Sequence, residues 1–72
     1  MVIHAVPASR GSHYIMADQR GSYGEVRCVR VGRMYMKLEM AMRRANELAK
    51  THHNVVVMSM EGGREVISYI PN

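Results

Sequence analysis

The chain has 72 residues, a formal net charge of +4 and an apolar fraction of 47%. This apolar fraction excludes an intrinsically disordered chain, and no window of the sequence approaches the apolar length that spans a membrane. The length predicts a single domain over residues 1–72, with a core so small that a partner subunit would add stability.

The cysteine content and the N-terminus both favour a reducing, cytoplasmic compartment. Cys28 is the one cysteine of the sequence, so no internal disulfide can form. The apolar run of residues 1–7 is short and carries no basic segment before it, so we expect no signal peptide. The protein is therefore expected to be cytoplasmic and to have no membrane partner.

Three strands are predicted before the first helical pattern. Residues 2–6 are apolar and stop at Pro7, which lacks a backbone N–H donor. Residues 13–17 form a second apolar segment, and a glycine-containing loop follows it. Residues 25–31 are rich in β-branched side chains, and Gly32 is expected to end this third strand.

The strongest periodic pattern predicts an amphipathic helix that ends near residue 50. Its apolar face consists of Met34, Leu38, Ala41, Met42, Ala45, Leu48 and Ala49. The start of this helix is left open. No capping residue stands before Met34. Met34, Met36 and Leu38 also alternate as in a strand. In the alternative interpretation, the helix therefore starts as late as Lys37.

A β-hairpin is predicted after the helix, with strands over residues 54–60 and 64–70. Gly62 and Gly63 tolerate the positive φ angles of a two-residue turn. The pairs expected from this turn are Met60 with Glu65, Met58 with Ile67, Val56 with Tyr69, Val57 with Ser68 and Val55 with Ile70. Both faces of the hairpin are apolar, and one helix covers only one of them, so we expect the second face to meet another chain.

Together these elements predict an α+β fold in the order β-β-β-α-β-β. An antiparallel sheet of four or five strands would be packed by one α-helix.

Several short motifs resemble an uncharacterised family of small bacterial and phage β-β-α-β-β proteins. The chain carries His4-Ala5-Val6-Pro7 and then Gly11 and Tyr14, where that family opens on His-Val-Val-Pro and continues with Gly and Trp. Further matching pieces are Ala45-Asn46-Glu47-Leu48-Ala49, Val55-Val56-Val57 and Gly62-Gly63. The chain departs from the family at Tyr14 and in a longer segment around residues 20–33. The resemblance implies no activity, since none is established for the family.

The size, element order and charge are also similar to those of phage-encoded anti-CRISPR proteins. Several of these proteins place one helix on an antiparallel sheet, and they block a nucleic-acid-binding surface or occupy a partner subunit. The resemblance is one of architecture rather than of motifs.

Basic residues are concentrated between residues 27 and 50, where the local charge is +5. Eight of the ten basic residues in the chain are Arg, which binds phosphates and carboxylates through two hydrogen bonds at once. Met36 and Met40 are expected on the outer side of the helix, as an apolar spot within this basic surface. The predicted binding residues are Arg27, Arg30, Arg33, Met36, Lys37, Met40, Arg43, Arg44 and Lys50.

No catalytic or metal-binding spacing accompanies these residues. His52 and His53 are adjacent, so on a helix their side chains would point about 100° apart, and they suit the negative end of the helix dipole better than a metal ion. Cys28 is expected to be a small buried thiol within its strand, with Arg27 on the opposite face. The sequence therefore predicts a non-enzymatic protein without a metal or cofactor.

The leading functional hypothesis is a phage or mobile-element inhibitor, anti-CRISPR-like in its action. Its expected partner is a host protein or ribonucleoprotein complex that handles nucleic acid. One alternative is direct, sequence-tolerant nucleic-acid binding through the same Arg residues. The other is a homo-oligomeric structural module, such as a homodimer formed through the second sheet face.

Overall fold

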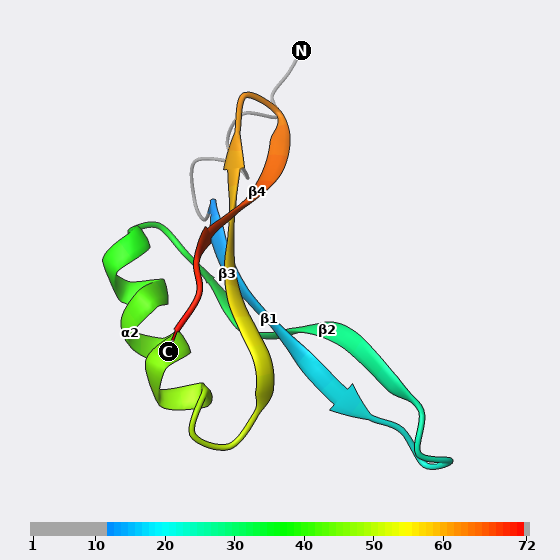
Figure 1. The fold of residues 1–72 in the computed structure, drawn as a ribbon. Coiled ribbons are helices and arrows are strands. Elements are labelled where there is room, and N and C mark those ends of the chain that lie inside the picture. The colour runs from blue at the N-terminus through cyan, green and yellow to red at the C-terminus, as the bar shows by residue number, and fades with distance from the viewer. Residues whose placement is uncertain (1–11, 72) are drawn as a thin grey trace.

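The computed structural model describes residues 12–71, which form one antiparallel sheet with one helix on it (Figure 1). The elements are β1 (His13–Arg20), β2 (Val26–Tyr35), α2 (Leu38–Leu48), β3 (His53–Glu61) and β4 (Arg64–Tyr69). The strands lie in the order β2-β1-β3-β4, and each is antiparallel to its neighbours. The α+β architecture predicted from the sequence is confirmed.

The order of the elements differs from the prediction by one strand. The described residues run β-β-α-β-β with four strands, not the five of the predicted order. The strand predicted over residues 2–6 lies outside the described residues. β1 corresponds to the strand predicted over residues 13–17 and continues to Arg20, because Gln19 and Arg20 pair with Arg27 and Val26 across the hairpin.

Strand β2 continues through Gly32, where the sequence predicts its end. Gly32 has a φ of +80°, and the pairing with β1 is displaced around it. Ile15 lies opposite Val31, but His13 lies opposite Tyr35, so β2 carries extra residues at this point. Glycine accommodates such a bulge because it adopts positive φ without a steric penalty. The bulge thus bends the strand instead of ending it.

The helix begins at Leu38, which confirms the later of the two starts left open by the sequence. Lys37 is the N-cap residue, and its carbonyl accepts hydrogen bonds from the N–H groups of Met40 and Ala41, at 3.2 and 3.4 Å. The predicted place of Met34 on the apolar face of the helix is wrong, because pairing with β1 draws this residue into β2.

The core lies between α2 and the face of the sheet beneath it. Its fully or nearly buried members are Ile15, Ala17, Ala41, Ala45, Leu48, Val55 and Val57. Two of the three helix residues in this set are alanines. Their small side chains let the helix lie close to β1 and β3, the two central strands.

The β3–β4 hairpin follows the predicted register only near its turn. Gly62 and Gly63 both have positive φ, as the turn requires, and Met60–Glu65 and Met58–Ile67 pair as predicted. A register shift then places Tyr69 opposite Val57 instead of Val56. The predicted pairs beyond Met58 are therefore wrong, because the pattern of alternating side chains does not reveal a bulge.

The face of the sheet away from α2 is also apolar. Alternation along the paired strands puts Tyr14, Met16, Met58 and Ile67 on this side, and Ile67 is 58% exposed. Val56 shares this side and is half-buried. Both faces of the β3–β4 hairpin thus carry apolar side chains, as predicted. We call this side the open face.

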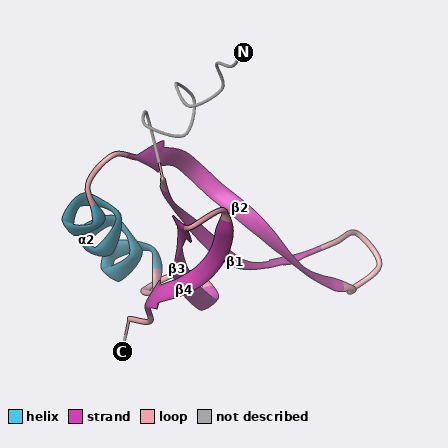
Figure 2. Cartoon of the chain, turned by 90° about the horizontal axis from the view of Figure 1, so that it is seen from above, coloured by secondary structure: helices cyan, strands magenta, loops and turns pink. Residues whose placement is uncertain are grey.

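The β1–β2 hairpin projects well past the helix, as Figures 1 and 2 show from two directions. The molecule is accordingly elongated, with principal extents of 44 × 26 × 17 Å. Within residues 12–71, α2 is too short to cross a bilayer.

Candidate interaction surfaces

Six of the predicted binding residues gather along one side of α2, next to the end of β2. Two adjoining open cavities of about 320 and 520 Å³ lie there, between the end of β2 and the helix. We call them together the basic groove. Its lining residues are Arg33, Met34, Tyr35, Met36, Lys37, Met40, Arg43, Arg44 and Glu47.

Helical spacing explains why the helix side of the groove is continuous. Met40, Arg43, Arg44 and Glu47 recur at intervals of three and four residues, so they lie on one side of α2. The buried Ala41 occupies the neighbouring side that faces the sheet. The packing of α2 on the sheet therefore determines which helix residues turn toward the end of β2.

Arg33 and Tyr35 form the wall that β2 contributes to the groove. The guanidinium carbon of Arg33 lies 5.4 Å from the centre of the Tyr35 ring, within the range of a cation–π contact. Tyr35 is half-buried and packs against the core. The contact with the core holds the Tyr35 ring in place. The ring in turn holds the Arg33 guanidinium beside the groove.

Three methionines give the groove its apolar surface. Met36 is 68% exposed, Met40 is 45% exposed and Met34 is 37% exposed. Met36 lies in the bend between β2 and α2, not on the helix, so the predicted helical spacing between Met36 and Met40 is wrong. Both side chains are nevertheless exposed at the same groove.

Glu47 reduces the positive charge of the groove at one end. Its Oε1 lies 2.8 Å from the Nη1 of Arg44, and the two side chains are 57% and 51% exposed. An exposed i,i+3 pair contributes only about 0.3–0.5 kcal/mol. Water or a carboxylate of a partner can therefore readily replace Glu47 at the Arg44 guanidinium. Arg33, Lys37 and Arg43 form no ion pair within residues 12–71.

The other three predicted binding residues lie away from the groove. Arg30 pairs with Met16 across β1 and β2, which places it on the open face. Arg27 lies farther out on the projecting hairpin, opposite Gln19. Lys50 follows the last turn of α2, at the opposite end of the helix from Lys37. The structure therefore divides the predicted basic stretch among separate surfaces.

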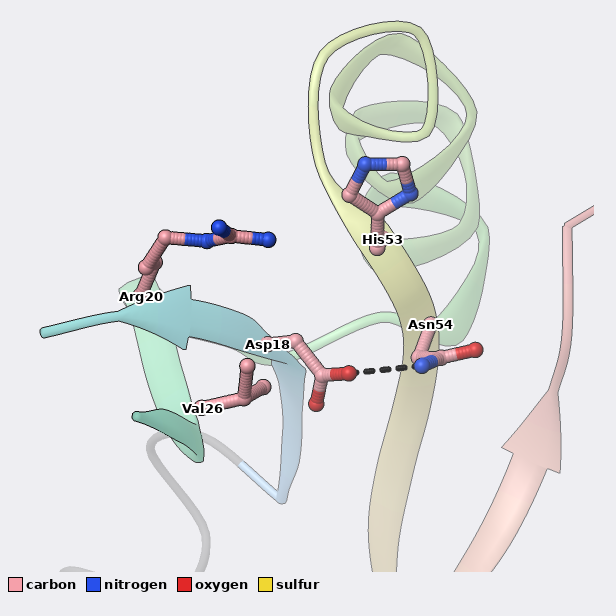
Figure 3. Close-up of a pocket in the computed structure, with 5 residues that line it drawn as sticks. All are labelled: Asp18, Arg20, Val26, His53 and Asn54. Atoms are coloured by element: carbon pink, nitrogen blue, oxygen red, sulfur yellow. Dashed lines mark hydrogen bonds between the residues drawn. The ribbon is translucent and has the colours of Figure 1, made fainter. Parts of the chain in front are cut away.

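A third open cavity, of about 310 Å³, lies where the projecting hairpin joins the sheet (Figure 3). Asp18, Arg20 and Val26 line it from the hairpin, and His53 and Asn54 line it from the start of β3. The Asn54 amide donates a 2.6 Å hydrogen bond to Oδ2 of Asp18. This bond occupies one oxygen of the Asp18 carboxylate.

A buried serine connects three elements on the helix side of the sheet. Ser59 is 2% exposed, and its hydroxyl accepts a hydrogen bond from Ser68 and lies 2.5 Å from Nδ1 of His13. A serine beside a histidine is the pair found in many nucleophilic sites. Here the hydroxyl is closed off from any substrate by its burial, so the network joins β1, β3 and β4 structurally.

Cys28 differs from expectation, and His52 lies at the end of the helix. Cys28 is exposed, so the prediction of a buried thiol is wrong: it pairs with Asp18, which alternates with the buried Ala17, and it therefore lies on the face of the sheet away from α2. His52 ends the helix through its backbone, whose N–H donates to the Leu48 carbonyl at 2.8 Å. No group of three metal-ligating side chains occurs within residues 12–71.

The sequence did not point to Tyr35, Met34 or Glu47 as groove residues. Tyr35 follows two residues after Arg33, which is the strand spacing that puts both on one face, but only if β2 is known to continue past Gly32. The spacing of Arg33 and Tyr35 therefore indicates a shared face, but the strand predicted from the sequence ends at Gly32, before both residues.

Comparisons with known proteins do not assign the chain to a family. No family model, no curated protein and no solved structure matches it.

Proposed function

We propose that this chain is a cytoplasmic, non-enzymatic binding protein whose basic groove holds an acidic segment of another protein. The partner would belong to a host complex that handles nucleic acid, and the chain would block it, as a small phage or mobile-element inhibitor does. The observation that carries this proposal is the meeting of Arg33, Lys37 and Arg43 with exposed methionines in one groove.

The mixture of charge and apolar surface favours a protein ligand over bare nucleic acid. Phosphate contacts need donors alone, whereas Met36 and Met40 offer apolar area that only an apolar side chain would bury. A stacking platform for bases needs an uncovered aromatic ring, and the Tyr35 ring already carries the Arg33 guanidinium. An acidic peptide with one or two apolar anchors would use both properties of the groove.

The mode of action follows from size. A standard protein interface covers about 800 Å² on each partner, and the surface of this chain totals 5420 Å². Binding through the groove would cover about one seventh of this surface, and the rest of the chain would stand beside the partner's site as a steric block. No chemistry is required of the chain.

The test begins with a pull-down from a lysate of the host, using the immobilised full chain and identifying the captured protein by mass spectrometry. The purified partner is then titrated against the wild type and two groove variants, Arg43→Ala/Arg44→Ala and Met36→Glu/Met40→Glu. We expect each double variant to weaken binding by about tenfold or more, since Arg and buried apolar anchors dominate interface energies.

Lys50→Ala is the matched control, because it removes a positive charge beyond the far end of α2. It should leave the dissociation constant within about twofold of the wild type, since rim charges contribute little. Equal binding by wild type and both groove variants would rule out the groove as the binding site. Failure to capture any acidic or nucleic-acid-associated protein would remove the inhibitor hypothesis.

A further inference from the structure

The outer part of the β1–β2 hairpin, residues 19–28, is a two-stranded ribbon that stands clear of the core. We call it the arm. Every residue of the arm except Gly21 is exposed, and the ribbon extends beyond α2 and beyond the ends of the neighbouring strands (Figures 1 and 2). The arm contributes no residue to the buried core. Its length and exposure therefore need an explanation other than packing.

The arm is an ordered ribbon with a closed turn. Gln19 pairs with Arg27 and Arg20 pairs with Val26. At the tip, the Gly21 N–H donates to the Glu25 carbonyl at 2.7 Å, and the Gly24 N–H donates to the Gly21 carbonyl at 3.1 Å. A ribbon held in this way presents its side chains in fixed directions.

The side chains of the arm suit an anionic partner. Arg20 and Arg27 lie in adjacent cross-strand pairs, so they point to opposite faces of the ribbon. Neither forms an ion pair within the described part of the chain. Glu25 is the one acidic residue of the arm, and its Oε1 accepts a 3.0 Å hydrogen bond from the Tyr23 backbone N–H. Tyr23 is 96% exposed at the tip.

Arg20 lies at the cavity at the base of the arm without an ion-pair partner. Asp18 is the nearest acidic residue along β1; one oxygen of its carboxylate accepts a hydrogen bond from the Asn54 amide, and Asp18 forms no ion pair with Arg20. The Arg20 side chain extends across the mouth of this cavity toward the side where His53 lies (Figure 3). The guanidinium thus stands beside an open, polar space.

The other hairpin of the same sheet provides an internal comparison. The β3–β4 turn is flanked by Glu61, Arg64 and Glu65, a local charge of −1, and Arg64 pairs directly with Glu61. The two hairpins project toward opposite ends of the molecule (Figure 1). The arm, with Arg20, Arg27 and Glu25, has a local charge of +1, so the excess of positive charge is a property of the arm and not of hairpins in this chain generally.

We propose that the arm enters the major groove of double-stranded DNA and binds it without strong sequence preference. The major groove is about 12 Å wide and admits a two-stranded β-ribbon. With the ribbon inserted edge-on, Arg20 would reach the phosphates of one strand and Arg27 those of the other, because the two side chains leave opposite faces. Tyr23, at the tip, would lie toward the floor of the groove. This site is separate from the basic groove and does not depend on it.

The test measures fluorescence anisotropy of a fluorescein-labelled duplex about two helical turns long, titrated with the full chain at several salt concentrations. Removing two phosphate contacts with Arg20→Ala/Arg27→Ala should reduce the slope of log K against log salt by about 1.8 and weaken low-salt binding by about tenfold or more. Tyr23→Ala should weaken binding by a smaller factor. Thermal unfolding of these variants should match the wild type, since none of the three residues is in the core.

Lys50→Ala/Arg64→Ala is the charge-matched control, since it also removes two positive charges but leaves the arm intact. It should keep the wild-type salt slope. The proposal is overturned if the wild type does not bind duplex DNA at low salt, if the arm variant binds as well as the charge-matched control, or if the same strand binds more tightly when unpaired. Loss of DNA binding in Arg43→Ala/Arg44→Ala but not in the arm variant would also overturn it. The groove itself would then be the nucleic-acid site. The arm variant should still capture the groove's protein partner, so the two proposals fail independently.

Discussion

The hydroxyl of Tyr69 on β4 donates a 2.8 Å hydrogen bond to the Oδ1 of Asn46 on α2. Among the strands that the structure describes, β4 lies at the edge of the sheet, with β3 as its one neighbour. The bond therefore ties the end of the outermost strand to the exposed side of the helix. Tyr69 also packs against the core, so one side chain combines an apolar contact with a specific polar one.

Tyr69→Phe removes this hydrogen bond and keeps the ring. We expect it to lower the free energy of unfolding by about 0.5–1.5 kcal/mol, the usual net value for one intramolecular hydrogen bond. The measurement is urea denaturation followed by far-UV circular dichroism. Asn46→Ala is the partner variant: in the Tyr69→Phe background it should cost less than it does alone. Strictly additive losses would mean that the two side chains do not interact in solution.

The contact between Tyr69 and Asn46 illustrates what the sequence could and could not predict. Local patterns correctly predicted the helix, the Gly62-Gly63 turn and the pairing next to that turn, because each depends on residues close in the chain. The bulges near Gly32 and Val57 leave the alternation of side chains ambiguous by one position. Contacts beyond each bulge, such as Tyr69 opposite Val57, were therefore predicted wrongly or not at all.

The same limit applies to the candidate site. Charge density predicted Arg33, Arg43 and Lys37 as binding residues, and the structure brings them into one groove. It also separates Arg27 and Arg30, which are close to Arg33 in sequence, because the faces of a strand alternate and β2 is long. A count of charges along the sequence does not show which basic residues share a surface in the folded chain.

Ser59 is the centre of the one buried polar cluster among the described residues, so its removal should be costly. Ser59→Ala leaves His13 and Ser68 without their shared partner. We expect a loss of about 1–2 kcal/mol in the free energy of unfolding, because polar groups that lose a partner in a partly buried place keep their desolvation penalty. For a domain of this size each kcal/mol lowers the melting temperature by about 4–8 °C.

Ser68→Ala is the matched variant for this cluster. It removes one of the two contacts and leaves Ser59 beside His13, so it should cost clearly less than Ser59→Ala. A larger loss for Ser68→Ala than for Ser59→Ala would contradict the central role of Ser59.

Gly32 should be more sensitive to substitution than its exposure suggests. Its φ of +80° disfavours any residue with a side chain, although a Cβ at this position would meet no atom within 4 Å. Gly32→Ala should therefore cost about 1–2 kcal/mol for conformational reasons alone. Gly32→Asn should cost less, since asparagine tolerates positive φ better than alanine. Equal stability of the wild type and Gly32→Ala, measured by thermal unfolding, would show that the backbone at this bulge can relax.

Ala45 lies where the helix packs against the sheet. Its side chain is 0% exposed, and Ile15 and Val57 are likewise fully buried in the same core. Ala45→Leu adds three carbon atoms where no space exists, so α2 must move away from the strands. We expect a loss of about 1–3 kcal/mol, the usual cost of overpacking a core. Because the basic groove lies between α2 and the end of β2, this displacement should also weaken partner binding at the groove.

Met42→Leu is the control on the same helix. It introduces the same side chain at a half-buried position with little change in volume or helix propensity, so it should cost less than about 1.5 kcal/mol. Both variants are compared by urea denaturation and by titration with the groove partner. If Ala45→Leu matched Met42→Leu in stability, the close packing of α2 on the sheet would not hold in solution. The groove would then be an adjustable surface whose shape depends on what it binds.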